Sequence, residues 1–313
     1  MPKSKSPLIC GIEGGGTKFT CAIGRSPDDA VLSPDFPTGD NPARLVDTVA
    51  NWMRQTSASI GPQQAIGLAS FGPIDLDSNS RSFGHITSTP KPGWQNFNIV
   101  GAFEHEFPGL PIAFDTDVNG AALGEHRWGI ARNFLDFVYV TLGTGVGVGG
   151  MSGGRLLRGM THPEMGHMFI PRLAGDDFPG NCPFHRDCWE GLCSGPALRA
   201  RTGTPAEQLD PSHPAWRLTA SYTACAFANI ALTLSPRRIV LGGSVSLGGR
   251  LGQDAFFAMI RSELQRRLNG YLDFPAFGAD ISRFIVSPEL KHPGVFGALA
   301  LAQQAVAPNS QEV

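Results

Sequence analysis

The sequence predicts a duplicated α/β fold, and two matching hairpins and an excess of glycine lead to this expectation. A buried strand at Leu8–Ile12 is followed by the turn Glu13-Gly-Gly-Gly-Thr17 and by a second strand at Lys18–Ile23. The same order of strand, glycine turn and strand returns at 137–151, where Gly143-Thr144-Gly145 forms the turn. Glycine makes up 39 of the 313 residues, well above the share of about 7% that is average for proteins. The glycines do not follow the G-X-Y period of collagen. Two such hairpins indicate two α/β halves with a cleft between them.

The other elements are expected from apolar periodicity and from short apolar runs. We expect a small first domain over 1–120 and a larger second domain over 121–294. A C-terminal helix at about 295–306, rich in small residues, is expected to pack back on the first domain. The remaining expected strands lie at 65–70, 111–114 and 238–241, and the remaining helices at about 43–57, 118–129, 196–201 and 216–234.

Composition excludes several classes of protein. The formal net charge of −2 and a pI of about 6.4 argue against a large basic face for nucleic acid. No stretch approaches the length of apolar residues that a membrane-spanning helix needs, and the N-terminus lacks the apolar core of a signal peptide. We therefore expect a cytoplasmic protein whose six cysteines stay reduced, which favours metal binding or burial over disulfides.

The glycine turns are suited to binding phosphate. Successive backbone N–H groups in such a turn form an anion-binding concavity, and a missing Cβ lets an oxyanion approach closely. A Walker A loop would lead into a helix, whereas both turns lead into strands. Tight hairpins without a ligand are the alternative, which two turns in matched positions disfavour. The candidate phosphate-binding residues are Gly14, Gly15, Gly16, Thr17 and Lys18 in the first turn, Gly143, Thr144 and Gly145 in the second, and Gly242 and Gly243 after a later strand.

An acidic cluster, Asp115-Thr-Asp117-Val-Asn119, lies where a buried strand ends and a helix begins. Asp and Asn are ordinary helix N-caps at such a position, and capping alone would explain one of them. The carboxyl end of a strand is also where open α/β sheets carry their chemistry. A carboxylate is ionised at neutral pH and can accept a hydroxyl proton, so the cluster is a candidate for catalysis.

A second cluster, Cys182-Pro-Phe-His185-Arg-Asp-Cys188, places three metal-binding side chains at equal steps of three residues. Such a loop can surround one tetrahedral zinc ion, with a fourth ligand from His167 or His162 upstream, and with Cys193 as a competitor. The other three cysteines, Cys10, Cys21 and Cys225, are expected in the core.

Two carboxylates near this cluster, Glu164 and Glu190, could accept hydrogen bonds from a polyhydroxylated ligand, although surface carboxylates are common without one.

Taken together, these motifs resemble the ROK family (repressors, open reading frames and sugar kinases) from Gly11 to Ala302. GIEGGGTKF resembles the family's DxGGTK phosphate motif, with Glu13 where aspartate is usual. DTDVNGAALGE resembles the catalytic segment, LGTGVGVG the second phosphate loop, and HPEMGH the ExGH motif. Most members carry CxCGxxGC, whereas Cys-x-x-His-x-x-Cys here is similar to the zinc-containing bacterial fructokinases, as are STPKPGWQN and YLDF.

The resemblance implies an actin-like, hexokinase-type (ribonuclease H-like) fold and transfer of the γ-phosphoryl of ATP to a sugar hydroxyl. It implies Asp117 as the catalytic base for the 6-hydroxyl, Mg²⁺ with the nucleotide, a structural Zn²⁺ and a homodimer. It also implies that the two turns hold ATP phosphates, that Gly242 and Gly243 lie under the adenosine, and that Lys91 replaces a sugar-contacting asparagine of many glucokinases, which favours fructose. The implied sugar contacts are Asn119, Glu164, His167 and Glu190, and the implied zinc ligands are His167, Cys182, His185 and Cys188.

Two other functions remain open on the sequence. A sugar-responsive repressor of the family would carry a helix-turn-helix before the first hairpin. Because the hairpin here already begins by Gly11, we expect a repressor less than a kinase. A kinase for glucose, mannose or an N-acetylhexosamine would use the same motifs. We therefore expect a fructokinase, with these other hexoses as the alternatives.

Overall fold

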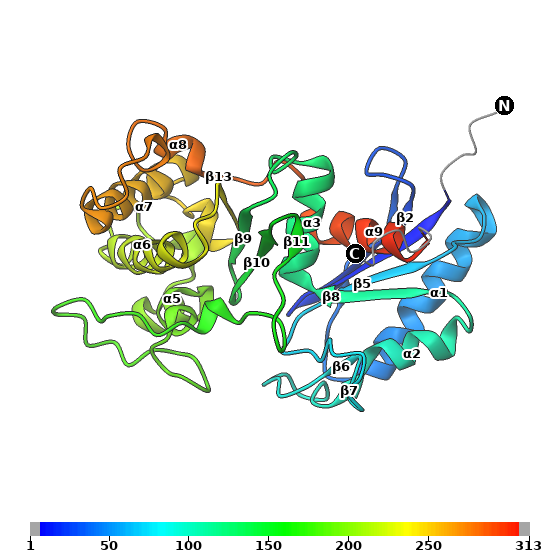
Figure 1. Ribbon diagram of the computed structural model, residues 1–313. Helices are drawn as coiled ribbons and strands as arrows, with labels where there is room; N and C mark the ends of the chain where they lie inside the picture. Colours follow the sequence, from blue (N-terminus) through cyan, green and yellow to red (C-terminus); the bar gives the residue numbers. More distant parts are fainter. Residues whose placement is uncertain (1–6, 307–313) are drawn as a thin grey trace. The chain divides into compact units, whose positions relative to one another are not determined.

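The computed structural model describes residues 7–306, which divide into two compact units. Within this range the first unit comprises residues 7–132, 156–163 and 289–306, and the second comprises residues 133–155 and 164–288. Figure 1 shows the elements of each unit in order along the chain. No helix among the described residues has both the length and the apolar character needed to cross a membrane.

The first unit is built on a mixed sheet in the order β3-β2-β1-β5-β8, with β4 also paired to β2. The hairpin of β1 and β2 is antiparallel, and the alignment of Ile12 with Cys21 places both in the core. β5 and β8 extend the sheet in parallel from β1, and all five residues of β5 are buried. The strands are β1 (Ile9–Gly14), β2 (Lys18–Gly24), β3 (Val31–Leu32), β4 (Phe36–Pro37), β5 (Ile66–Ser70) and β8 (Ile112–Thr116).

Helices and a small second sheet complete this unit. The helices are α1 (Pro42–Ile60), α2 (Ile99–Glu106), α3 (Asp117–Trp128) and α9 (Pro293–Val306), and the small sheet pairs β6 (His85–Ile86) with β7 (Phe97–Asn98). The expected helix at about 43–57 is therefore longer at both ends, since the Asn41 side chain caps α1. α2 was not expected from the sequence.

The C-terminal helix α9 packs against β1, β5 and α3, as Figure 1 shows in red. Glycine makes this close approach possible. A Cβ at Gly67 on β5 would overlap the carbonyl oxygen of Ala298, and one at Gly297 would overlap that of Gly120 on α3. Part of the glycine excess therefore serves the packing of backbone on backbone.

The second unit repeats the arrangement of hairpin and parallel strands in a sheet of order β11-β10-β9-β12-β13. β9 and β10 form the antiparallel hairpin, and β12 and β13 continue in parallel. This repeat confirms the predicted duplicated α/β fold. The strands are β9 (Phe137–Leu142), β10 (Val146–Ser152), β11 (Arg155–Leu156), β12 (Ile239–Gly242) and β13 (Ile285–Val286).

The helices of the second unit include one long helix that the sequence analysis did not predict. α7 buries residues spaced one, three or four positions apart, from Phe256 to Leu268, against α6, so its amphipathic signal was present. The α-helices are α4 (Trp189–Cys193), α5 (Gly195–Thr202), α6 (Ala215–Leu234), α7 (Gln253–Leu268) and α8 (Ile281–Phe284), and the 3₁₀ turns are η1 (Met165–His167), η2 (Ala206–Gln208), η3 (Val245–Leu247) and η4 (Pro275–Phe277).

Candidate active site and metal centre

The first glycine turn is closed by hydrogen bonds that use its carbonyl groups. The amide of Gly15 donates to the carbonyl of Lys18 at 2.9 Å. Thr38, which is 2% exposed, donates its hydroxyl to Gly15 O at 2.9 Å and its amide to Thr17 O at 3.0 Å. The amides of Gly16 and Thr17 bond to no described residue. Two adjacent free N–H groups are the donors that an anion-binding turn needs. Thr38 was missed because it follows the turn by some twenty residues and belongs to no motif.

The side chains predicted in this turn differ in their surroundings. Thr17 is exposed. The ammonium of Lys18 lies 2.6 Å from a carboxylate oxygen of Asp35, whose other oxygen accepts from Thr20 at 2.9 Å. Lys18 is therefore already ion-paired, and its contact with ATP stays a prediction.

Asp117 is the first residue of α3, directly after β8. Thr116, rather than an aspartate, is the N-cap, and its hydroxyl accepts from the amide of Asn119. Asp117 is half-buried and accepts from the amide of Val118 at 2.8 Å. Burial raises the pKa of Asp117 to about 6, against the opposing effect of the backbone hydrogen bond. A carboxylate of this kind is a stronger base than an exposed one and is still ionised at neutral pH.

Glu13, at the end of β1, adds a second carboxylate with a raised pKa. Burial and then the negative charge of Asp117 raise the pKa of Glu13 to about 7, although Lys18 and the amide of Val295 oppose the shift. Its carboxylate lies against Gly294 at the start of α9, where a Cβ would overlap it. The helix N-terminus partly compensates the charge of Glu13.

The raised pKa of Asp117 leads to an expected pH dependence. If Asp117 is the base, kcat/KM should be full above about pH 7 and fall roughly tenfold per pH unit below about pH 6, because the protonated carboxyl cannot accept a proton. The free energy of unfolding should change in the opposite sense. Because the pKa of Asp117 is higher in the folded than in the unfolded protein, protonation favours the folded state, and this stabilisation is lost as the pH rises from about 4 to 6. Initial rates between pH 5 and 8 test this expectation. A kcat/KM that stays constant down to pH 5 would contradict it.

The neighbouring members of the acidic cluster are tied to the fold. Asp115 is fully buried and pairs with Arg158, whose Nε lies 3.1 Å and Nη2 2.5 Å from Oδ2. The side chain of Asn119 is 1% exposed, and its amide donates to Asp115 at 2.9 Å and to Leu157 O at 3.2 Å. The structure thus gives Asn119 a structural task, and its contact with sugar stays a prediction.

The second glycine turn resembles the first. Gly143 donates to Gly145 O at 2.9 Å, and the amide of Gly195 donates to Gly143 O at 2.7 Å. Among the described residues, the amides of Thr144 and Gly145 have no hydrogen-bond acceptor. Glu190 accepts from the amide of Val146 at 2.9 Å and lies under this turn. The turn therefore presents free donors and contacts one of the predicted sugar-binding side chains.

A pocket of about 720 Å³ lies beside this turn. Its walls come from the start of α5, from the segment before and within η2, and from the segment after β12; they include Gly195, Arg199, Ala206, Glu207, Ser244 and Leu247. Gly243, just before the pocket, has φ of +93°, which only glycine adopts easily. A Cβ at Gly242 would lie 2.5 Å from the Tyr139 hydroxyl, so close packing also requires glycine there. The predicted contact of both glycines with adenosine stays a prediction.

Four predicted ligands form a candidate metal centre: His167, Cys182, His185 and Cys188. Their ligand atoms all lie within 4.8 Å of one another. Nδ1 of His167 is 3.5 Å from Sγ of Cys188 and 3.6 Å from Sγ of Cys182, which is 3.8 Å from Nδ1 of His185. Zinc bonds of about 2.0–2.3 Å in a tetrahedron give ligand separations of about 3.5 Å, so this donor set fits zinc.

The structure distinguishes the competing ligands. His162 accepts from the amide of Ile74 at 3.0 Å and is not part of the cluster. Cys193 is also outside the cluster and donates to the carbonyl of Thr219. His167, rather than His162 or Cys193, therefore completes the candidate metal cluster. The prediction that the remaining cysteines, Cys10, Cys21 and Cys225, lie in the core is confirmed.

Two polar groups that were predicted to contact sugar adjoin the candidate metal cluster. Because Nδ1 of His167 faces the cysteines, its Nε2 points away and lies 4.0 Å from Oε1 of Glu190. Glu190 is the second residue of α4, which begins at Trp189 directly after Cys188. Glu164 is exposed immediately before η1. A bound metal would thus hold one imidazole and one carboxylate in place, and their contact with sugar stays a prediction.

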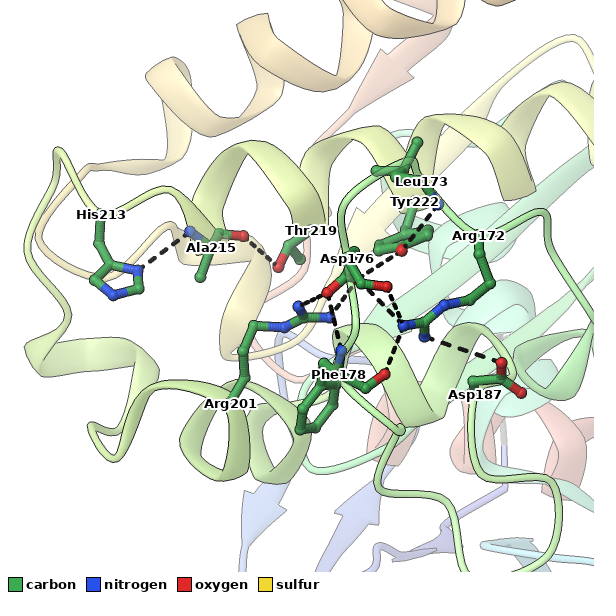
Figure 2. Close-up of polar contacts among 10 residues, drawn as sticks. All are labelled: Arg172, Leu173, Asp176, Phe178, Asp187, Arg201, His213, Ala215, Thr219 and Tyr222. Carbon is green, nitrogen blue, oxygen red and sulfur yellow. Dashed lines mark hydrogen bonds and ion pairs between the residues drawn. The ribbon is translucent and has the colours of Figure 1, made fainter.

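A partly buried ion-pair network braces the segment that carries these ligands (Figure 2). Asp176 is hydrogen-bonded by both Nη atoms of Arg201 on α5 and by the hydroxyl of Tyr222 on α6 at 2.6 Å. Burial acts to raise the pKa of Asp176, but these hydrogen bonds outweigh it and lower the pKa to about 2. The guanidinium of Arg172 donates to the backbone carbonyl of Asp176 and lies 3.9 Å from the carboxylate of Asp187. Asp187 lies in the sequence between two residues of the candidate metal cluster, His185 and Cys188. The network therefore links the metal loop to two helices.

Comparisons with known proteins agree with this geometry. The ROK family model matches residues 9–305. A fructokinase of Zymomonas mobilis is 39% identical over 309 residues, covering 97% of this chain and 99% of the relative. A fructokinase of Pediococcus pentosaceus is 38% identical, covering 96% and 99%. The crystal structure of a ROK hexokinase from Thermus thermophilus matches with a TM-score of 0.73 and 25% identity, covering 96% of this chain and 99% of that one.

The match extends over nearly the whole chain and includes both sheets, both glycine turns and the metal-binding segment. It confirms the predicted actin-like, hexokinase-type architecture. The chain therefore belongs to the ROK family.

Proposed function

We propose that this protein is an ATP-dependent fructokinase that transfers the γ-phosphoryl group of ATP to the 6-hydroxyl of D-fructose. The observation that carries the choice of sugar is the match, at 38–39% identity and over almost the full length of each chain, with two relatives called fructokinases. The altered metal motif, Cys-x-x-His-x-x-Cys, supports the same choice. ATP and sugar are the substrates, Mg²⁺ accompanies the nucleotide, and the enzyme acts as a cytoplasmic homodimer.

The second unit is proposed to bind the adenosine in the pocket bounded by Arg199, Glu207 and Leu247. The free amides of Thr144 and Gly145 are next to this pocket through the Gly195–Gly143 hydrogen bond, and they would bind phosphate oxygens. In the first unit, the free amides of Gly16 and Thr17 would do the same. These donors stabilise the charge that spreads over the phosphoryl oxygens during transfer.

Asp117 is proposed as the base. It accepts the proton of the sugar hydroxyl while the hydroxyl oxygen bonds to the γ-phosphorus and the bond between that phosphorus and ADP breaks. Glu164, His167 and Glu190 orient the sugar. A Zn²⁺ ion held by His167, Cys182, His185 and Cys188 would supply structural rigidity, so that His167 keeps Nε2 available as a hydrogen-bonding group.

A panel of sugars tests the proposed specificity. With saturating MgATP and a coupled measurement of ADP release, kcat/KM for fructose should exceed that for glucose, mannose and N-acetylmannosamine by about tenfold or more, because specific hydroxyl contacts discriminate among hexoses. NMR of the product should show a phosphate on C6. A higher kcat/KM for glucose than for fructose would overturn the choice of sugar, although not that of a hexose kinase.

A further inference from the structure

The side chain of Lys91 lies beside the first glycine turn. Lys91 belongs to the segment between β6 and β7 and is half-buried. A Cβ added at Gly16 would lie 3.5 Å from Cε and 3.9 Å from Nζ of Lys91, which are its closest neighbours. The lysine therefore adjoins the part of the turn where the amides of Gly16 and Thr17 have no partner among residues 7–306.

Aromatic packing holds this lysine in place. Its Nζ lies 5.6 Å from the centre of the Phe71 ring, within the range of a cation–π contact. The amide of Phe71 donates to Gly14 O at 2.7 Å, which ties the ring to the turn. Trp94 is fully buried, packs edge-on against Phe71 and donates its amide to the carbonyl of Lys91 at 3.2 Å. The ammonium is thus positioned by the core of the first unit.

The charge of Lys91 has no counter-ion among the described residues, none of whose carboxylates lies within 4.0 Å of its ammonium. Lys18, by contrast, is paired with Asp35. Burial lowers the pKa of Lys91, because its charged form is partly desolvated without compensation. An anion bound to the two free amides would compensate this charge. The turn and the lysine together therefore form a site for a group with several negative oxygens.

We propose that the Lys91 ammonium is a catalytic group that binds the phosphoryl group being transferred and remains with it from ATP to the sugar 6-phosphate. This inference rests on the proposed phosphate-binding function of the Gly14–Thr17 turn. Lys91 stays protonated throughout, since the hydroxyl proton goes to Asp117 and the leaving electron pair to ADP. An ammonium is a compact point charge suited to phosphoryl oxygens.

Substitution of Lys91 tests this role. We expect Lys91→Met to lower kcat by about 10²–10³-fold, the usual cost of removing one group that stabilises developing charge, and Lys91→Arg to recover part of the loss. Calorimetry should show that Lys91→Met binds fructose within about twofold of the wild type, whereas its affinity for fructose 6-phosphate falls about tenfold or more. Lys291→Met, at an exposed lysine of the same unit, is the matched control and should behave as the wild type.

Two outcomes would overturn the proposal. Equal losses of affinity for fructose and fructose 6-phosphate would show that Lys91 contacts the sugar rather than the phosphoryl group. An unchanged kcat would show that Lys91 does not stabilise the phosphoryl group during its transfer.

Gly16→Ala separates the failure of this proposal from that of the turn itself. The fold should accept the methyl group, because its nearest neighbour would be 3.5 Å away, yet the methyl would obstruct an anion at the free amides. We expect an unchanged Tm and a rise of about tenfold in KM for ATP. Normal ATP kinetics in Gly16→Ala would overturn both the phosphate-binding role of the turn and the proposed role of Lys91. Impaired ATP kinetics in Gly16→Ala, together with normal activity of Lys91→Met, would overturn only the role of Lys91.

Discussion

Replacing Asp117 by asparagine should lower kcat by about 10²–10⁴-fold, the usual contribution of a general base, while fructose affinity stays within a few fold of the wild type. Asparagine keeps the shape of the side chain and can still accept the hydrogen bond from the amide of Val118, so α3 should begin as before. It cannot accept the hydroxyl proton. Stopped-time assays with MgATP and fructose, together with calorimetric titration of fructose, measure the two quantities.

Asp115→Asn is an informative control for this experiment. Asp115 is two residues upstream, fully buried and paired with Arg158, so its loss should lower Tm more than turnover. The residual activity of Asp117→Asn should also lack the acid limb near pH 6. Near-normal turnover in Asp117→Asn would remove Asp117 from the role of base.

The second large effect is expected from the metal centre. Cys188→Ser should lose the zinc that the wild type carries at about one equivalent, and Tm should fall by about 5–10 °C, as a loss of roughly 3 kcal/mol would cause. KM for fructose should rise about tenfold, because His167 and Glu190 lose the metal that orients them. Metal analysis of the purified protein, thermal unfolding and steady-state kinetics measure these changes.

Cys193→Ser is the matched control, since this buried cysteine is near the cluster in sequence but outside it in space. It should keep its zinc. Removal of zinc from the wild type by a chelator should reproduce the behaviour of Cys188→Ser, and added zinc should reverse it. A wild type that holds less than about a tenth of an equivalent of metal, with a Tm indifferent to chelator, would contradict a structural zinc site.

The glycine excess shows how far composition can lead. From the sequence it indicated backbone close to an anion, and the free amides of Gly16 and Gly145 agree with that expectation. Other glycines have a different reason, since Gly67 and Gly297 permit α9 to meet β5 and α3. No local pattern distinguishes these two uses, because the neighbour that excludes a Cβ comes from a distant part of the chain.

The two hairpins, the metal-binding chemistry of the Cys/His segment and the place of Asp117 at the end of a strand could be predicted from the sequence, because each depends on residues within a few positions of one another. The tertiary structure was needed to place His167, and not His162 or Cys193, in the candidate metal cluster. It alone brought Thr38 and Lys91 to the first turn, since both come from segments far along the chain. Local spacing specifies which side chains a segment presents, whereas the packing of strands and helices decides which distant side chains they meet.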